Sequence, residues 1–225
     1  MFEGYTQQTI DFLWNLSFNN ERSWFLAHKE EFLTYVDGPT RALAAELTQE
    51  MTRAYPQLGL ECKVSRIYRD ARRLFGRGPY KDHLWFSLRK PGEHDSAIPC
   101  FYFEVAPQRY SYGVGCWDPT PLTMAKLRAR IDRDPAPVEK LARQLKRRGE
   151  FELEGEMYKR PKGDPGPLLY PWYNRRQIGF GRDENCEGAF FTPQLADKVL
   201  DGWKSLVPHY RWLRELSADP PPEHM

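Results

Sequence analysis

Apolar residues recur every three to four positions through the first 55 residues of the chain, a spacing typical of amphipathic helices. Thr6 can cap a first helix, and a second helix is predicted over residues 21–36. Asp37-Gly38-Pro39 is expected to end the second helix, because proline favours the first turn of a new one. The pattern therefore predicts three helices before any strand, the third reaching about Tyr55.

From residue 61 the apolar positions alternate with polar ones, which is the pattern of strands whose two faces differ. On the first of these strands Arg66 falls on the same face as Cys62, Val64 and Tyr68. Its guanidinium is expected to have a partner or to await a ligand, because an unpaired buried charge costs several kcal/mol. Four strands are predicted in this part of the chain, at 61–69, 83–89, 100–105 and 109–117.

Two glycines, Gly113 and Gly115, fall on one face of the fourth predicted strand and leave its backbone bare. Such a face admits another segment of the chain or a ligand, and the first is favoured about two to one. Glu104, on the neighbouring strand, could look across this bare patch. Glu104 and Asp70 are the carboxylates that we would test as an acid or base.

The remaining pattern returns to helices, with short strands near 151–158 and 178–183 and a long helix that begins after Thr192. A sheet of antiparallel strands covered mainly on one face by helices follows, so the fold class predicted is α+β. We expect a single domain over residues 1–218, with N-terminal helices and a long C-terminal helix, and a disordered tail over 219–225.

Composition narrows the class of protein. The 225 residues carry a formal net charge of +2, which does not favour a dedicated nucleic-acid-binding protein. No apolar run approaches the roughly 20 residues that span a membrane, and the N-terminus has no signal-peptide pattern. Four scattered cysteines predict neither disulfides nor a metal site. We therefore expect a soluble cytoplasmic protein with no cofactor and no membrane partner, and its oligomeric state is left open.

Positive charge is concentrated in one short stretch, where the chain reads as strand, tight loop and second strand. Converging arginine forks favour carboxylate or phosphate as a ligand. Against them stands one carboxylate, Asp70. The seven positive side chains between residues 63 and 81 are Lys63, Arg66, Arg69, Arg72, Arg73, Arg77 and Lys81.

No recognised catalytic motif is present: the sequence lacks GxGxxG, GxxxxGK[ST], GxSxG and HExxH. Asp82-His83 and Glu93-His94-Asp95 could hold a cation, but single motifs of this kind are usually polar loops. The sequence therefore predicts no metal and assigns no reaction.

Arg66-Ile-Tyr-Arg69-Asp70-Ala-Arg72, followed by Pro79-Tyr80-Lys81, resembles the RxxRDxRF…PYK signature of the DUF2461 family, a domain of unknown function. Residues 19–25 are similar to the NNxxxWF segment of that family, and Lys159-Arg160-Pro161 to a later KRP. The resemblance covers about 2–216. This chain departs from the family pattern at Arg73, Gly76 and Arg77, so a role for a carboxylate at position 76 is not carried over. The resemblance implies no established activity, substrate or cofactor.

Two functions from different classes follow. In the first, the protein binds, or binds and acts on, an anionic small molecule that carries phosphate or carboxylate, at a site made by Arg66, Arg69, Asp70, Arg72, Arg77, Tyr80 and Lys81. In the second, it is a protein- or nucleic-acid-interaction module without catalysis. Its contact surface would then be Trp172, Tyr173, Arg175 and Arg176, and the arginine motif would be scaffold, paired with Glu30, Glu31 or Glu46.

Overall fold

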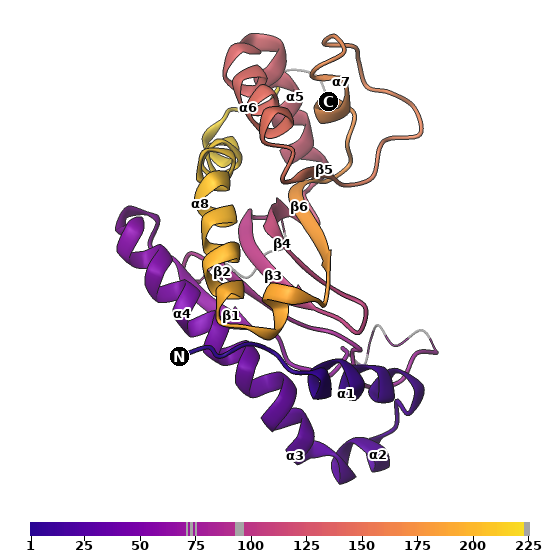
Figure 1. Ribbon diagram of the computed structural model, residues 1–225. Helices are drawn as coiled ribbons and strands as arrows, with labels where there is room; N and C mark the ends of the chain where they lie inside the picture. The colour runs from indigo at the N-terminus through magenta and orange to yellow at the C-terminus, as the bar shows by residue number, and fades with distance from the viewer. Residues whose placement is uncertain (71, 73, 75, 93–96, 223–225) are drawn as a thin grey trace. The chain divides into compact units, whose positions relative to one another are not determined.

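The computed structural model describes residues 1–70, 72, 74, 76–92 and 97–222 (Figure 1). These residues have an α+β fold, as predicted, with helices at the N-terminus and a long helix near the C-terminus. The strands form an antiparallel sheet in the order β1-β2-β3-β4-β6-β5. The chain divides into two compact units, the first made of Met1–Pro91, Tyr102–Tyr112 and Asp183–Asp201, the second of Gly92–Phe101, Gly113–Arg182 and Gly202–Met225. The single-domain assignment stays a prediction.

The helices and strands have the following bounds. The helices are α1 Gln7–Phe18, α2 Arg22–Ala27, α3 Lys29–Phe32, α4 Gly38–Ala54, α5 Pro121–Arg133, α6 Ala136–Arg148, α7 Tyr170–Tyr173 and α8 Gln194–Glu215. The strands are β1 Glu61–Val64, β2 Leu84–Arg89, β3 Cys100–Val105, β4 Arg109–Cys116, β5 Glu152–Glu154 and β6 Ile178–Asn185.

In the first unit, α4 packs against β1 and β2. Its apolar stripe, Leu43, Leu47 and Met51, is buried as its helical spacing predicts. Near the N-terminus, the ring of Tyr5 stacks on Phe190 with ring centroids 4.8 Å apart. The Tyr5 hydroxyl also bonds to the Thr40 hydroxyl at 3.0 Å, which satisfies a buried polar group and joins the N-terminal segment to α4.

The second and third predicted helices are continuous through Asp37-Gly38-Pro39, so the prediction of a break there is wrong. A π-helical turn, Leu33–Asp37, leads directly from α3 into α4. The Thr9 hydroxyl donates a hydrogen bond to the carbonyl oxygen of Tyr35 in this turn at 2.6 Å. Pro39 cannot donate to the Tyr35 carbonyl four residues earlier, and the Thr9 hydroxyl supplies that bond instead, so the chain can widen locally and stay helical.

The first strand is shorter than predicted. It ends at Val64, paired with Phe86 on β2, and a last backbone bond joins the Ser65 N–H to the Trp85 carbonyl at 2.8 Å. Beyond this point the buried positions change from even-numbered to odd-numbered residues: Ser65 and Ile67 are buried and Arg66 is exposed. The prediction that Arg66 lies on a buried apolar face is therefore wrong.

In the second unit, the two glycines of β4 allow a close approach of β6. A Cβ added to Gly113 would stand 2.1 Å from the Phe180 carbonyl oxygen, and one added to Gly115 would stand 2.8 Å from the Cα of Gly179. The bare face is therefore occupied by backbone, as favoured above, rather than left open for a ligand.

Near the C-terminus, the predicted tail begins with a residue that has partners. The Asp219 carboxylate accepts a hydrogen bond from the Arg130 Nε at 2.5 Å, and its side chain is 14% exposed. Residues 223–225 lie outside the described residues.

Candidate functional site

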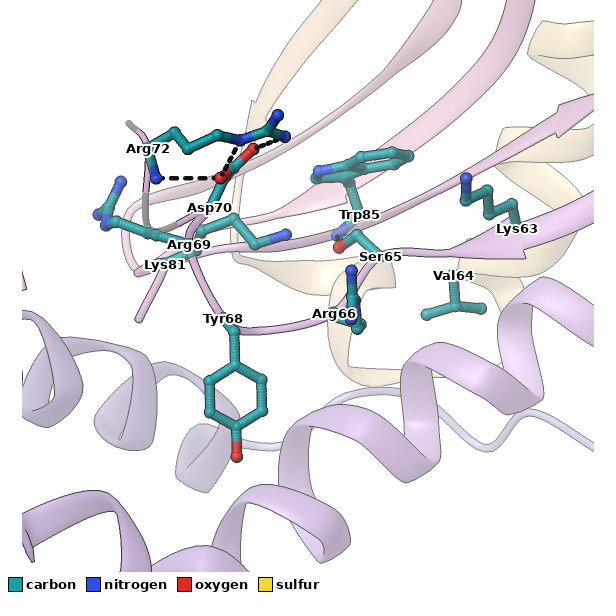
Figure 2. A pocket seen from close by; sticks show the side chains of 10 residues that line it. All are labelled: Lys63, Val64, Ser65, Arg66, Tyr68, Arg69, Asp70, Arg72, Lys81 and Trp85. Atoms are coloured by element: carbon teal, nitrogen blue, oxygen red, sulfur yellow. Dashed lines mark hydrogen bonds and ion pairs between the residues drawn. The ribbon is translucent and has the colours of Figure 1, made fainter. Parts of the chain in front are cut away.

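A pocket of about 500 Å³ opens in the first unit beside β1 and β2 (Figure 2). It lies at the arginine-rich stretch that the sequence singles out. Its described lining residues are Lys63, Val64, Ser65, Arg66, Tyr68, Arg69, Asp70, Arg72, Lys81 and Trp85.

A short antiparallel bridge brings the two halves of this stretch together. Tyr68 pairs with Tyr80, the Arg69 N–H donates to the Pro79 carbonyl, and the Lys81 N–H donates to the Ile67 carbonyl, both at 2.8 Å. Residues that lie 10 to 14 positions apart in the sequence are therefore neighbours in the fold. This bridge explains why the RxxRD and PYK segments lie side by side in the fold.

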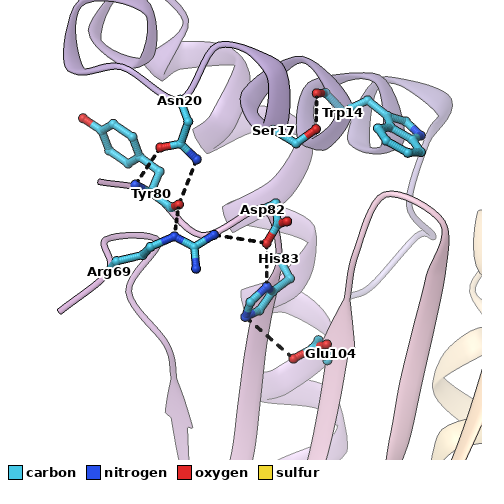
Figure 3. Close-up of polar contacts among 8 residues, drawn as sticks. All are labelled: Trp14, Ser17, Asn20, Arg69, Tyr80, Asp82, His83 and Glu104. Atoms are coloured by element: carbon cyan, nitrogen blue, oxygen red, sulfur yellow. Dashed lines mark hydrogen bonds and ion pairs between the residues drawn. The ribbon is translucent and has the colours of Figure 1, made fainter. Parts of the chain in front are cut away.

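Asn20 holds this bridge from the other side (Figure 3). Its side-chain amide donates to the Tyr80 carbonyl and accepts from the Tyr80 N–H, both at 2.9 Å. Gly78 lies against it so closely that an added Cβ would stand 2.3 Å from the Asn20 Oδ1. The turn between α1 and α2 thus fixes the position of the PYK segment, 60 residues later in the chain.

The ring of Tyr80 is 2% exposed and stacks on Phe25 at 4.2 Å. Tyr80 therefore contributes packing and backbone groups, and it lies outside the described lining of the pocket.

Arg69 uses part of its guanidinium to bond to the same bridge. Its Nε donates to the Tyr80 carbonyl at 2.6 Å, and its Nη2 lies 3.6 Å from the Asp82 carboxylate. Its side chain is 14% exposed. Figure 3 shows its guanidinium turned toward these two groups, and Figure 2 shows it pointing away from Trp85. One predicted anion ligand therefore has a structural role, and any further role in binding stays a prediction.

The acidic group of the pocket also has a partner. Arg72 grips Asp70 with two parallel bonds, Nε to Oδ1 at 3.0 Å and Nη2 to Oδ2 at 2.7 Å. The cations of the lining are Lys63, Arg66, Arg69, Arg72 and Lys81, against the single carboxylate of Asp70 among the described lining residues. The pocket therefore carries an excess of positive charge.

Arg66 and Lys63 differ from Arg69 and Arg72. Among the described residues, none forms a hydrogen bond or an ion pair with the guanidinium of Arg66 or with the amine of Lys63. Both side chains are exposed and line the pocket; Lys63 lies on β1, and Arg66 lies just after it. They are the cations that a ligand can reach without displacing an internal partner.

Lys81 is half-buried, and its ammonium lies 5.5 Å from the centre of the Trp85 ring. Burial lowers the pKa of Lys81 to about 8; Glu104 opposes this shift, and Arg69 and Arg66 add to it. The group therefore holds its proton less firmly than an exposed lysine does.

Next to this pocket, His83 connects two carboxylates. Its Nδ1 lies 2.9 Å from the Asp82 Oδ1, and its Nε2 lies 3.9 Å from the Glu104 Oε2 (Figure 3). Burial raises the pKa of Glu104. Glu104 is thus a carboxyl with a perturbed proton affinity beside a histidine, which fits an acid or base, although it is outside the described lining of the pocket.

The structure brings together five of the seven predicted ligand residues: Arg66, Arg69, Asp70, Arg72 and Lys81. Arg77 is exposed and, like Tyr80, lies outside the described lining. Arg73 lies outside the described residues. Sequence reasoning missed Trp85 and Ser65, although both stand on the polar side of predicted strands.

The alternative contact surface is not exposed as that hypothesis requires. Trp172 is 3% exposed and Tyr173 is 9% exposed, so neither ring can stack on a partner. Arg176 pairs with Glu156 at 3.1 Å, and Arg175 donates to the Gly155 carbonyl. The expectation of an aromatic contact surface there is wrong, because α7 buries its rings.

Metal-ligating side chains do not converge in the described residues. No group of three or more His, Cys, Asp or Glu within 1–70, 72, 74, 76–92 and 97–222 is arranged to hold an ion. Glu93-His94-Asp95 lies outside these ranges. All four cysteines carry free thiols, three of them buried. In the same ranges, no helix combines the length and apolar character that crossing a bilayer requires.

Comparison with known protein families gives a match over most of the chain. The family model described as "Conserved hypothetical protein (DUF2461)" matches residues 8–212 of the 225. No curated protein matches the chain. The match covers both ends of the RxxRD…PYK stretch and the Asn20 region that holds it. The chain belongs to the DUF2461 family.

Proposed function

We propose that the pocket binds a small molecule that carries a phosphate or carboxylate group. The observation that carries the proposal is the charge of its described lining: five cations and one carboxylate, and that carboxylate is already paired with Arg72. Cations gathered without enough internal carboxylates repel one another, and an anion relieves that repulsion.

The size of the pocket supports a small ligand. A volume of about 500 Å³ falls in the usual range of about 300–1,000 Å³ for small-molecule sites. Trp85 gives it an apolar wall beside the charged one. This combination favours a metabolite with both an anionic and an apolar part over a bare inorganic ion.

Arg66, Lys63 and Lys81 are expected to make the direct contacts, because no described carboxylate forms an ion pair with any of them. Arg69 and Arg72 are expected to contribute mainly long-range charge, since each is already bonded to an acceptor. The motif thus combines scaffold and ligand contacts in one short segment.

The test is anion-dependent stabilisation of the whole chain. Thermal unfolding is followed with phosphate, pyrophosphate and citrate, with potassium chloride at matched ionic strength as the blank. At 100 times Kd an anion should add about 2.7 kcal/mol to the free energy of unfolding, a rise in Tm of roughly 5–10 °C for a chain of this size. Isothermal titration then measures Kd directly.

Two variants that each remove one positive charge make the test specific. Arg66→Gln alters the pocket, whereas Lys29→Gln alters an exposed cation at the start of α3 that does not line it. We expect Arg66→Gln to weaken binding at least tenfold and Lys29→Gln to leave it unchanged. Equal effects of the two variants, or no anion effect on the wild type beyond the chloride blank, would refute the proposal.

A further inference from the structure

Lys81 brings a primary amine into the pocket in an unusual setting. The side chain is half-buried and extends toward Trp85 and Ser65 (Figure 2). Its Nζ lies 5.5 Å from the centre of the indole ring, and none of the described carboxylates lies within ion-pair distance of it. A lysine in a pocket usually stays protonated and serves as a fixed positive charge, but no described carboxylate forms an ion pair that would keep Lys81 protonated.

The surroundings raise the share of the neutral amine. Burial is the largest cause of the lowered pKa of Lys81, about 8, and the charges of Arg69 and Arg66 act in the same direction against that of Glu104. At pH 7 about a tenth of such amines are unprotonated, roughly 300-fold more than for a lysine with the ordinary pKa. Desolvation and adjacent cations are the two means by which proteins make a lysine nucleophilic.

The same cations would place a reactive partner. An anion held by Arg66 and Lys63 lies in the pocket that Lys81 enters, so a carbonyl group on that anion is brought to the amine. Holding the two groups together replaces an encounter in solution by a reaction within one complex.

We propose that Lys81 is a nucleophile that forms an imine with the carbonyl carbon of an anionic aldehyde or ketone, such as an oxo acid or a phosphorylated carbonyl compound. This inference rests on the proposed function, since it needs the anion to bind. The neutral amine adds to the carbonyl carbon and gives a carbinolamine. The carbon–oxygen bond then breaks, both hydrogens of the amine leave with the oxygen as water, and a carbon–nitrogen double bond remains.

Within this inference Glu104, which lies outside the described lining of the pocket, is the group that assists the departure of water. Its charge acts on Lys81, and burial raises the pKa of its carboxyl, so that it keeps a proton to a higher pH than an exposed glutamate. A carboxyl of that kind can protonate the leaving hydroxyl and take the proton back. Neither oxidant nor reductant is needed for imine formation.

The experiment uses pyridoxal 5′-phosphate as a probe that carries an aldehyde and a phosphate. The full chain is incubated with it at pH 7.5, the imine is reduced with borohydride, and the modified lysines are located and quantified by peptide mass spectrometry. Pyridoxal, which lacks the phosphate, is the matched control, and glyoxylate with cyanoborohydride tests a carboxylate in place of the phosphate. The other lysines of the chain, such as exposed Lys29, serve as internal references.

The expected result is that Lys81 is modified about 100-fold faster than Lys29 by pyridoxal 5′-phosphate, but not by pyridoxal, and that inorganic phosphate competes. Lys81→Arg, which keeps the charge, should abolish this fast modification, whereas Lys159→Arg, the same change at an exposed lysine outside the described lining, should leave it in place. The wild-type distribution over lysines needs no variant, so the test stands even if Lys81→Arg folds poorly.

Modification of Lys81 no faster than that of Lys29 would overturn the inference, as would preferential modification of Lys63. If phosphate still stabilises the protein in that case, the anion-binding proposal survives and only the imine is excluded. If phosphate has no effect either, both fail. Equal modification by pyridoxal and its phosphate would show that the anion is not used to place the carbonyl, which also contradicts the inference.

Discussion

Replacing Asn20 by alanine should destabilise the protein well beyond what a half-buried side chain in a turn suggests. The Asn20 amide makes two bonds to the backbone of Tyr80, one as donor and one as acceptor, both at 2.9 Å. Alanine supplies neither group. The Tyr80 carbonyl keeps its bond from Arg69, but the Tyr80 N–H, in a residue that is 2% exposed, loses its partner.

The magnitude follows from these bonds. Each contributes about 1 kcal/mol, and a buried N–H left without an acceptor costs about 1–3 kcal/mol. We therefore expect Asn20→Ala to lower the free energy of unfolding by about 2–4 kcal/mol, which corresponds to a fall in Tm of roughly 5–15 °C for a chain of this size. Asn19→Ala is the matched control, because the Asn19 amide donates only to the Asn15 carbonyl at an exposed position. Its expected effect is within about 0.5 kcal/mol.

Urea unfolding of the two variants and the wild type measures the difference, and amide hydrogen exchange locates it. Protection of the Tyr80 N–H should be lost in Asn20→Ala before global unfolding. A free energy within 0.5 kcal/mol of wild type, together with an unchanged exchange rate at Tyr80, would refute the reasoning. It would mean that the PYK segment is held by the bridge between Tyr68 and Tyr80 alone.

Two further predictions concern groups away from the pocket. In native protein Cys62 should react with a thiol reagent well before Cys100, Cys116 and Cys186, because Cys62 is half-buried and the others are buried. After unfolding without reductant all four thiols should react. A count of fewer than four would contradict the free state of the cysteines. Burial lowers the pKa of His209 to about 4. As the pH falls below about 6.5, His209 is therefore protonated in the unfolded chain before it is protonated in the folded protein. Unfolding free energy should therefore decrease by about 3 kcal/mol between pH 6.5 and 4 on account of His209, and His209→Gln should flatten that decrease in urea titrations at several pH values.

The central strands could be predicted from the sequence because both their ends and their faces are marked by residue type. β3 has the predicted bounds, Cys100–Val105, since Pro107-Gln108 turns the chain directly into β4. The end of β1 could not be predicted in the same way. Alternation of residues continues past Val64, but the hydrogen bonds to β2 do not continue beyond Ser65, and only the partner strand determines where pairing stops.

The helical break at Asp37-Gly38-Pro39 failed as a prediction for a related reason. Gly and Pro lower helix propensity, yet the Tyr35 carbonyl, to which Pro39 cannot donate, accepts a bond from the Thr9 hydroxyl, and the chain continues through a π-helical turn. The bond from Thr9 to the Tyr35 carbonyl that accompanies this turn joins positions 26 residues apart. Tertiary contacts of that kind leave no local signal in the sequence.

Part of the candidate site was visible in the sequence, because charge density is a local property. Lys63, Arg66 and Lys81 were found by counting cations. Trp85 was not, although it falls on the polar face of its predicted strand, because only the folded chain brings Lys81 and the segment after β1 beside it. The division of the arginines between structure and pocket was also hidden, because it depends on the carbonyl of Tyr80 and the carboxylate of Asp82.

That division makes a prediction that separates the two roles within one motif. Arg69 bonds to the Tyr80 carbonyl at 2.6 Å, so Arg69→Gln should lower the free energy of unfolding by about 2 kcal/mol, the usual value for a bond to a charged donor. Arg66 has no described partner and stands among like charges, so Arg66→Gln should leave the unfolding free energy of the free protein unchanged or raise it by up to about 0.5 kcal/mol.

Anion binding should respond in the opposite order. Arg66→Gln removes a direct contact and should abolish most of the rise in Tm that phosphate or pyrophosphate produces, whereas Arg69→Gln should retain much of that rise on a lower baseline. Urea unfolding with and without the anion measures both quantities on the same samples. If Arg66→Gln destabilises the free protein as much as Arg69→Gln does, then both arginines are scaffold, and the excess charge of the pocket is a by-product of folding rather than a site kept for a ligand.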